Sequence, residues 1–150
     1  MAPGFLTLYE PGTSVSVTLK TDGSGNVAQL NELVEIVGEN STHTEVARCA
    51  TRGAAVAMVE TLPNEYDSSK NYGNDVEVGE ATVLVRHAVD WLIPEASPAA
   101  GDMMTSTTSG TVDALDTAGG DTGDMAIGPV WTTLNRGAQT DGKVAVVRQR

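Results

Sequence analysis

The second half of this chain of 150 residues repeats the pattern of its first half. The first copy runs from about residue 31 to residue 86, and the second from about residue 101 to residue 148. When Arg86 is aligned with Arg148, the residues before them fall on one another, with Thr82, Leu84 and Val85 on Val144, Val146 and Val147. An earlier segment aligns as well, with Val56, Ala57, Val59 and Thr61 on Ile127, Gly128, Val130 and Thr132. Two copies of a supersecondary unit favour a closed or paired β-structure, because solenoids need three or more repeats.

The segments within each copy are short, β-branched and separated by Gly and Asp about every ten residues, which is typical of strands. Residues 30–40 fit both helical and strand periodicity, but the second copy is rich in Thr and Ser at 101–110, which favours strands in both. Residues 82–93 are expected to form two strands or one bent strand. Further strands are predicted at 14–19, 45–49 and 53–62 and near residues 103, 112, 127 and 144. We therefore predict an all-β fold, a small β-barrel or β-sandwich built from two similar β-units.

The predicted organisation is an N-terminal arm, residues 1–13, followed by a single β-domain, residues 14–150, that contains the internal repeat. The arm has Pro-Gly turn signals around four large apolar residues, Phe5, Leu6, Leu8 and Tyr9. It is either a terminal strand of the sheet or an extended segment that lies on a neighbouring subunit. The long polar loop at 63–79 is expected to be functional or mobile.

The composition excludes several classes of partner. Twenty acidic residues against nine basic ones give a net charge of −11, which disfavours binding to nucleic acid. No apolar run approaches the ~20 residues of a membrane span, and the N-terminus lacks the pattern of a signal peptide, so we expect a soluble protein without a membrane partner. Few lysines and many acids also fit a protein that works in concentrated salt, where charge repulsion is screened. The single Cys49 cannot form an internal disulfide and is expected to be a buried apolar side chain.

The sequence offers few residues for catalysis. His43 and His87 are the only histidines, and strand alternation would place His87 and Asp90 on opposite faces. The chain has no nucleophile elbow, zinc-binding helix, paired cysteines or phosphate loop. We therefore expect no enzymatic activity and no cofactor. Four carboxylates in a Gly-rich loop are weak candidates for a hard cation such as calcium, although their spacing is not that of an EF-hand: Asp113, Asp116, Asp121 and Asp124.

Two tryptophans and two arginines are candidates for a subunit interface. Trp131 lies in the repeated strand where the first copy has Glu60, and Trp91 lies shortly before Pro94. Both tryptophans either fill the core or cover an interface, where Trp is enriched. Arg86 and Arg148 end equivalent strands and would form an ion pair, either across a subunit boundary or locally.

The second copy resembles the small capsid decoration, or cement, proteins of tailed bacteriophages and archaeal viruses. The matching positions are Ala100-Gly101-Asp102, Gly110-Thr111-Val112, Ile127-Gly128, Gly142 and Val144 to Arg148. The match covers the last third of the chain well and the middle more loosely. Pro129 and Trp131 depart from the smaller residues usual in that family, and the loop at 63–79 is additional.

This resemblance implies a β-subunit, commonly a homotrimer, on the outer surface of an icosahedral head that is assembled in the host cytoplasm. Its partners would be the major capsid protein, whose subunits it clamps together, and other copies of itself. The acid-rich composition would then indicate a virus of a halophilic archaeon. The arm residues Phe5, Leu6, Leu8 and Tyr9 would make the capsid contact. The alternatives are a cation- or carbohydrate-binding β-module, another virion component such as a tail or turret protein, and a hydrolase with an unusual site.

Overall fold

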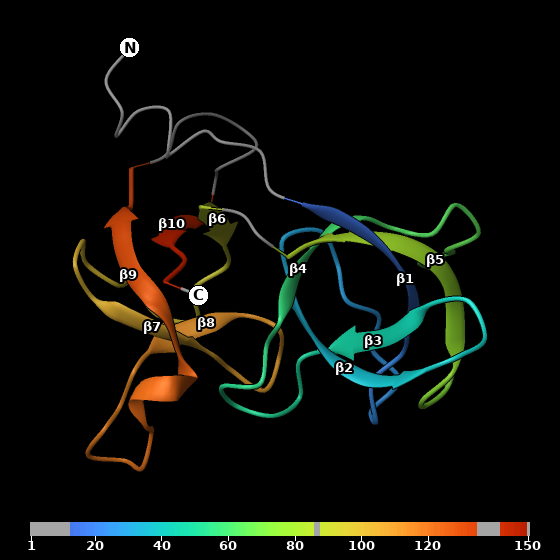
Figure 1. The fold of residues 1–150 in the computed structure, drawn as a ribbon, viewed down its shortest axis with the longest axis horizontal. Helices are drawn as coiled ribbons and strands as arrows, with labels where there is room; N and C mark the ends of the chain where they lie inside the picture. Colours follow the sequence, from blue (N-terminus) through green and yellow to red (C-terminus); the bar gives the residue numbers. More distant parts are fainter. Residues whose placement is uncertain (1–12, 86–87, 135–141, 150) are drawn as a thin grey trace.

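The computed structural model describes residues 13–85, 88–134 and 142–149, and these form two β-units that lie side by side (Figure 1). The predicted all-β class is confirmed, since the described residues contain ten strands, no α-helix and a single 3-10 turn, η1 (Gly123–Met125). None of their elements is a helix long and apolar enough to span a membrane. Residues 1–12 of the arm, Arg86 and His87 lie outside the described residues.

The first unit is a closed barrel of five strands in the order β1-β3-β2-β4-β5. Strands β1 and β3 are parallel, and the other pairs are antiparallel. Alternation directs one set of apolar side chains inward, where Val17, Leu19, Val34, Val46, Val59 and Val83 form the core. The strands are β1 (Ser14–Lys20), β2 (Leu33–Glu39), β3 (Thr44–Arg48), β4 (Ala57–Thr61) and β5 (Glu77–Leu84).

The second unit is a five-stranded sheet in the order β6-β10-β9-β7-β8. Numbering each unit from its first strand gives the same order in both, because the barrel read from β1 is β1-β5-β4-β2-β3. A parallel bridge between Pro94 and Val112 joins the two ends of the sheet, as the parallel β1–β3 pairing does in the barrel. The strands are β6 (Val89–Leu92), β7 (Met103–Ser106), β8 (Val112–Ala114), β9 (Ala126–Thr132) and β10 (Val144–Val147).

The two units also share the register of their strand pairs, which confirms that the fold consists of two similar β-units. Pairs of facing residues in the first unit have counterparts in the second unit. The correspondences are Val17↔Ala81 with Leu92↔Val144, Val59↔Val83 with Val130↔Val146, Thr61↔Thr82 with Thr132↔Ala145, Val34↔Ala57 with Met104↔Gly128, Ile36↔Val46 with Ser106↔Val112, and Leu19↔Val46 with Pro94↔Val112. Even the irregularity after Val59 recurs after Val130, so Glu60 and Trp131 occupy the same bulge.

The sequence alignment of the last strands is wrong by one residue. Pairing and burial equate Ala81 and Val83 with Val144 and Val146, so Arg148 corresponds to Val85 rather than to Arg86. The aligned segments at 81–85 and 144–147 are almost continuously apolar, and a shift by one residue leaves such a run looking the same. Only the inward or outward direction of each side chain reveals the correct register.

A second apolar core lies between the units and contains residues from both. Leu33, Cys49 and Met58 of the first unit pack with a set from the second: Leu92, Met104, Val112, Val130, Val144 and Val146. Backbone hydrogen bonds cross the same junction, where the Leu33 amide donates to the Gly110 carbonyl (2.8 Å) and the Gly110 amide donates to the Cys49 carbonyl (3.2 Å). The predicted strand at 53–62 begins only at Ala57, because the residues before it belong to this junction. Residues 82–93 likewise form two strands, β5 and β6, one in each unit.

Candidate partner-contact surface

The outward face of β1, β5 and β4 in the first unit is polar, and we call it the polar face: Ser14, Ser16, Glu60, Thr61 and Thr82. Glu60 projects from the bulge of β4, and its carboxylate accepts hydrogen bonds from the hydroxyls of Ser14 (2.7 Å) and Thr82 (3.0 Å). The Thr61 and Thr82 hydroxyls bond to each other across the strands at 2.8 Å. These polar side chains hydrogen-bond to one another and are suited to contact with water.

The corresponding face of β6, β10 and β9 in the second unit is largely apolar, and we call it the aromatic face: Val89, Trp91, Trp131, Thr132 and Ala145. Val89 is buried, at 3% exposed, and Trp131 is the one exposed member of this set. Trp131 occupies the position of Glu60 and is 61% exposed. Trp91 takes the place of Ser16 and is half-buried opposite Ala145, which is fully buried. Just beyond β9, Leu134 is 63% exposed. Trp131 therefore does not fill the core of its own chain, and it exposes a large apolar side chain to solvent.

The two faces also differ in charge. The residue before Ala81 is Glu80, whose side chain is 63% exposed, and the residue before the equivalent Val144 is Lys143. The polar face thus has two carboxylates on or beside it, from Glu60 and Glu80. Among the described residues at the outward positions of the aromatic face none is acidic, and Lys143 lies beside it. In a chain of net charge −11, this face is a local exception.

The structure places Arg148 inside the protein. Its side chain is 10% exposed and donates a hydrogen bond to the fully buried carboxylate of Asp90 at 2.5 Å, and another to the Val85 carbonyl at 2.8 Å. Arg148 thus forms the local ion pair that was one of the two arrangements expected for it. The guanidinium joins the end of the second unit to the end of β5 in the first, which stabilises the junction.

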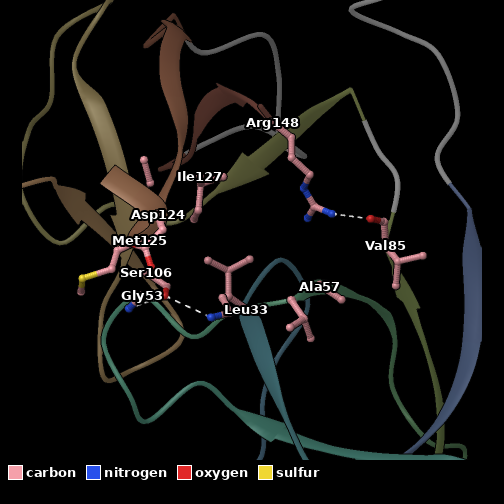
Figure 2. Close-up of a pocket in the computed structure, with 12 residues that line it drawn as sticks. Leu33, Gly53, Ala57, Val85, Ser106, Asp124, Met125, Ile127 and Arg148 are labelled. Atoms are coloured by element: carbon pink, nitrogen blue, oxygen red, sulfur yellow. Dashed lines mark hydrogen bonds between the residues drawn. The ribbon is translucent and has the colours of Figure 1, made fainter. Parts of the chain in front are cut away.

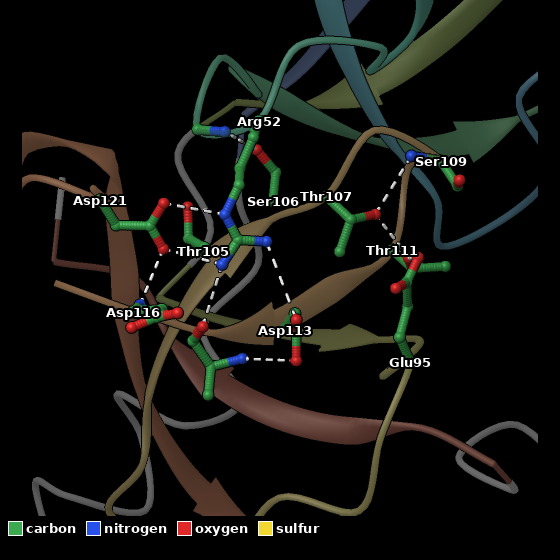
Figure 3. Close-up of polar contacts among 12 residues, drawn as sticks. Arg52, Glu95, Thr105, Ser106, Thr107, Ser109, Thr111, Asp113, Asp116 and Asp121 are labelled. Atoms are coloured by element: carbon green, nitrogen blue, oxygen red, sulfur yellow. Dashed lines mark hydrogen bonds and ion pairs between the residues drawn. The ribbon is translucent and has the colours of Figure 1, made fainter. Parts of the chain in front are cut away.

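The acidic loop after β8 is organised by an arginine from the first unit (Figure 3). Arg52 binds the Asp121 carboxylate through two hydrogen bonds of 2.8 and 2.7 Å, and it also donates to the Ala114 carbonyl at 3.0 Å. Asp113 lies 3.8 Å from the same guanidinium. The hydrogen bond from Arg52, helped by the Asp116 amide, lowers the pKa of Asp121 to about 2. This cluster is thus a charge-paired contact between the units.

The other two carboxylates of the weak cation candidate make local contacts. Asp116 accepts a hydrogen bond from the Gly119 amide at 2.9 Å, and Asp124 accepts one from the Thr122 hydroxyl. Within the part of the chain that the structure describes, no group of three or more His, Cys, Asp or Glu residues is arranged to hold a metal ion. The four aspartates therefore do not form one shared site.

A pocket of about 310 Å³ lies at the junction of the units, between the loop that precedes β4 and the start of β9 (Figure 2). Its walls are largely apolar, with Leu33, Val56 and Ile127 among them. The polar groups at its edge make structural bonds: the Ser106 hydroxyl accepts the Gly53 amide at 3.0 Å, and Arg148 holds Val85.

Sequence reasoning missed Arg52 and Ser106, which join the units. Arg52 is 69 positions from Asp121 and Ser106 is 53 positions from Gly53, so no local pattern connects either pair. The available signal for Arg52 was its charge, because it is a basic residue in the loop before a strand of a strongly acidic chain.

Comparison with known proteins gives a similarity of structure only. No protein-family model matches the chain, and no curated protein matches it in sequence. The fold is similar to that in the crystal structure of the N base of head fiber gp8.5 in bacteriophage phi29, with a TM-score of 0.54. The similarity covers 91% of this chain and 93% of that one, at 16% sequence identity. It shows that the two chains share their fold over nearly their whole length.

Proposed function

We propose that this protein is a structural component of a virion that decorates and stabilises an icosahedral head by binding between subunits of the major capsid protein. The observation that carries the proposal is the similarity of the whole fold to the base of a phage head fiber. Because the match covers 91% of this chain, it extends over both β-units and is not limited to one small barrel.

The surface chemistry supports a role in assembly. Trp131 and Leu134 are large apolar side chains held in water on a well-packed scaffold, which is typical of a surface that another protein covers. The arm residues Phe5, Leu6, Leu8 and Tyr9, which lie outside the described residues, add a second apolar group that would extend over a neighbouring capsid subunit.

The proposed mechanism is the addition of many modest contacts. The decoration proteins that the sequence resembles are commonly trimers. Self-association of this kind would place several aromatic faces and arms on one site of the head. Each further contact would then form at a high effective concentration, so that weak individual contacts give stable attachment. No chemical step is required of any residue.

Co-sedimentation of the purified protein with heads of its source virus, in concentrated salt, tests this function. We expect saturable binding at a fixed ratio to the major capsid protein. Deletion of residues 2–12 should leave the circular dichroism spectrum unchanged and weaken binding. Absence of binding by the intact protein over the whole range of salt concentrations would contradict the proposal, and undiminished binding by the deletion variant would contradict the role of the arm alone.

A further inference from the structure

We propose that the protein binds the head through the aromatic face of its second unit, so that this unit lies against the shell and the polar face of the first unit remains in solvent. This inference rests on the proposed function and adds the orientation of the molecule and the chemistry of the partner surface. The partner is a shell protein that offers an apolar recess with carboxylates at its rim.

The duplication provides an internal control for this inference. Both units have the same strand order, the same pair register and the same bulge. The neighbours of the bulge differ, since Val89 and Ala145 are buried where Ser14 is exposed and Thr82 is half-buried. The first unit has Glu60 in the bulge, which shows that the bulge itself does not need an aromatic residue. Trp131 is 61% exposed at that position and gains little from burial within its own chain. Its apolar surface is therefore available to a partner.

Charge indicates the nature of that partner. The aromatic face has Lys143 beside it, where the polar face has Glu80, and no acidic residue occupies its described outward positions. A recess with acidic groups at its rim complements this arrangement, and buried Trp131 would anchor the contact. A second copy docking face to face would offer Lys143 no carboxylate from the described outward positions of that face, and both molecules would carry a net charge of −11.

The test exchanges residues between the two units. Trp131→Glu introduces the residue that the first unit has at the same bulge, so the fold should tolerate it, and Trp131→Ser removes the apolar surface without adding charge. The matched control is Glu60→Gln, which changes the equivalent position of the polar face. Circular dichroism and thermal unfolding verify that each variant folds, and light scattering gives its oligomeric mass. Binding to heads is measured by co-sedimentation over a range of protein concentrations.

We expect both Trp131 variants to bind heads about tenfold or more weakly than the parent protein, as for a central aromatic contact, and Glu60→Gln to bind equally well. Binding of the parent with equal binding of the Trp131 variants would overturn the orientation and leave the proposed function intact. An equal loss in Glu60→Gln would overturn it too. A changed oligomeric mass in the Trp131 variants would assign the face to a second copy, against this inference. Failure of the parent protein itself to bind would contradict the proposed function instead.

Discussion

At the scale of the residue, the arginines at the junction differ in how deeply they are placed. Arg148 and Asp90 form an ion pair whose side chains are 10% and 0% exposed, whereas Arg52 and Asp121 are 31% and 7% exposed. A buried pair is costly to break from one side, because the remaining charge has no water around it. Asp121 keeps some exposure and also accepts a hydrogen bond from the Asp116 amide, so the loss of Arg52 leaves its carboxylate partly solvated and bonded.

Replacing Arg148 with Met should therefore lower the free energy of unfolding by about 3–5 kcal/mol, because it leaves the Asp90 carboxylate buried without this partner. The double variant Asp90→Asn/Arg148→Met should recover part of that loss. Urea unfolding at neutral pH measures both. Arg52→Met is the control and should cost much less. A cost for Arg148→Met no larger than that of the control would contradict the buried pair.

The Arg52–Asp121 pair predicts a dependence of stability on pH. Asp121 has a pKa of about 2 in the folded protein against an ordinary value of 3.8, because Arg52 binds its charged form. A lowered pKa stabilises the fold above the ordinary value, and the contribution is lost as the pH falls from about 4 toward 2. The melting temperature of Arg52→Met should thus lie below that of the parent at pH 6, with the difference shrinking toward pH 2. A difference that stays constant over this range would show that the pair is not responsible.

At the scale of the element, β9 and β10 approach more closely than their counterparts β4 and β5. A Cβ atom placed on Gly128 would lie 1.6 Å from the Val147 carbonyl oxygen, whereas the first unit has Ala57 at the equivalent position. The close approach is a local difference between two otherwise matched sheets. It shows that the second unit is drawn more tightly together at this point.

Gly128→Ala should accordingly destabilise the protein by about 1–3 kcal/mol, because β9 and β10 must separate to admit the methyl group. Gly123→Ala is the matched control, since a Cβ there meets nothing within 4 Å. Chemical unfolding of the two variants gives the comparison. Equal stabilities would mean that the strands can separate at no cost.

The sequence predicted the positions of the strands better than the correspondence between the strands of the two units. Alternation in residues 14–19 and the Thr/Ser-rich segment at 101–110 were enough to locate β1, β7 and, through the repeat, β2. The equivalence of β1 with β6 could not be seen, because only inward positions such as Val17 and Leu92 are alike. The outward positions differ, as Ser16 and Trp91 do. The same divergence at Glu60 and Trp131 is what distinguishes the candidate surface.

At the scale of the whole molecule, the two units share a core and should unfold together. Leu33 belongs to β2 of the first unit but packs in the cluster that the second unit completes. Both tryptophans lie in the second unit, so their fluorescence reports on that unit alone. A cavity made in the first unit should therefore change the unfolding transition that the tryptophan fluorescence of the second unit reports.

Leu33→Ala should lower the stability by about 2–5 kcal/mol and shift the tryptophan fluorescence transition and the circular dichroism transition to the same lower urea concentration. Ile36→Ala, at a 59% exposed position of the same strand, is the control and should change little. A fluorescence transition that stays in place while the circular dichroism transition moves would show that the units unfold independently.

The most direct test of the account is a reconstruction by electron cryomicroscopy of heads incubated with the protein, compared with untreated heads. We expect additional density on the outer surface between major capsid protein subunits, into which the two units fit with Trp131 of the second unit directed at the shell. Density in which the first unit contacts the shell would contradict the orientation. Heads without additional density, under saturating protein, would contradict the proposed decoration function itself.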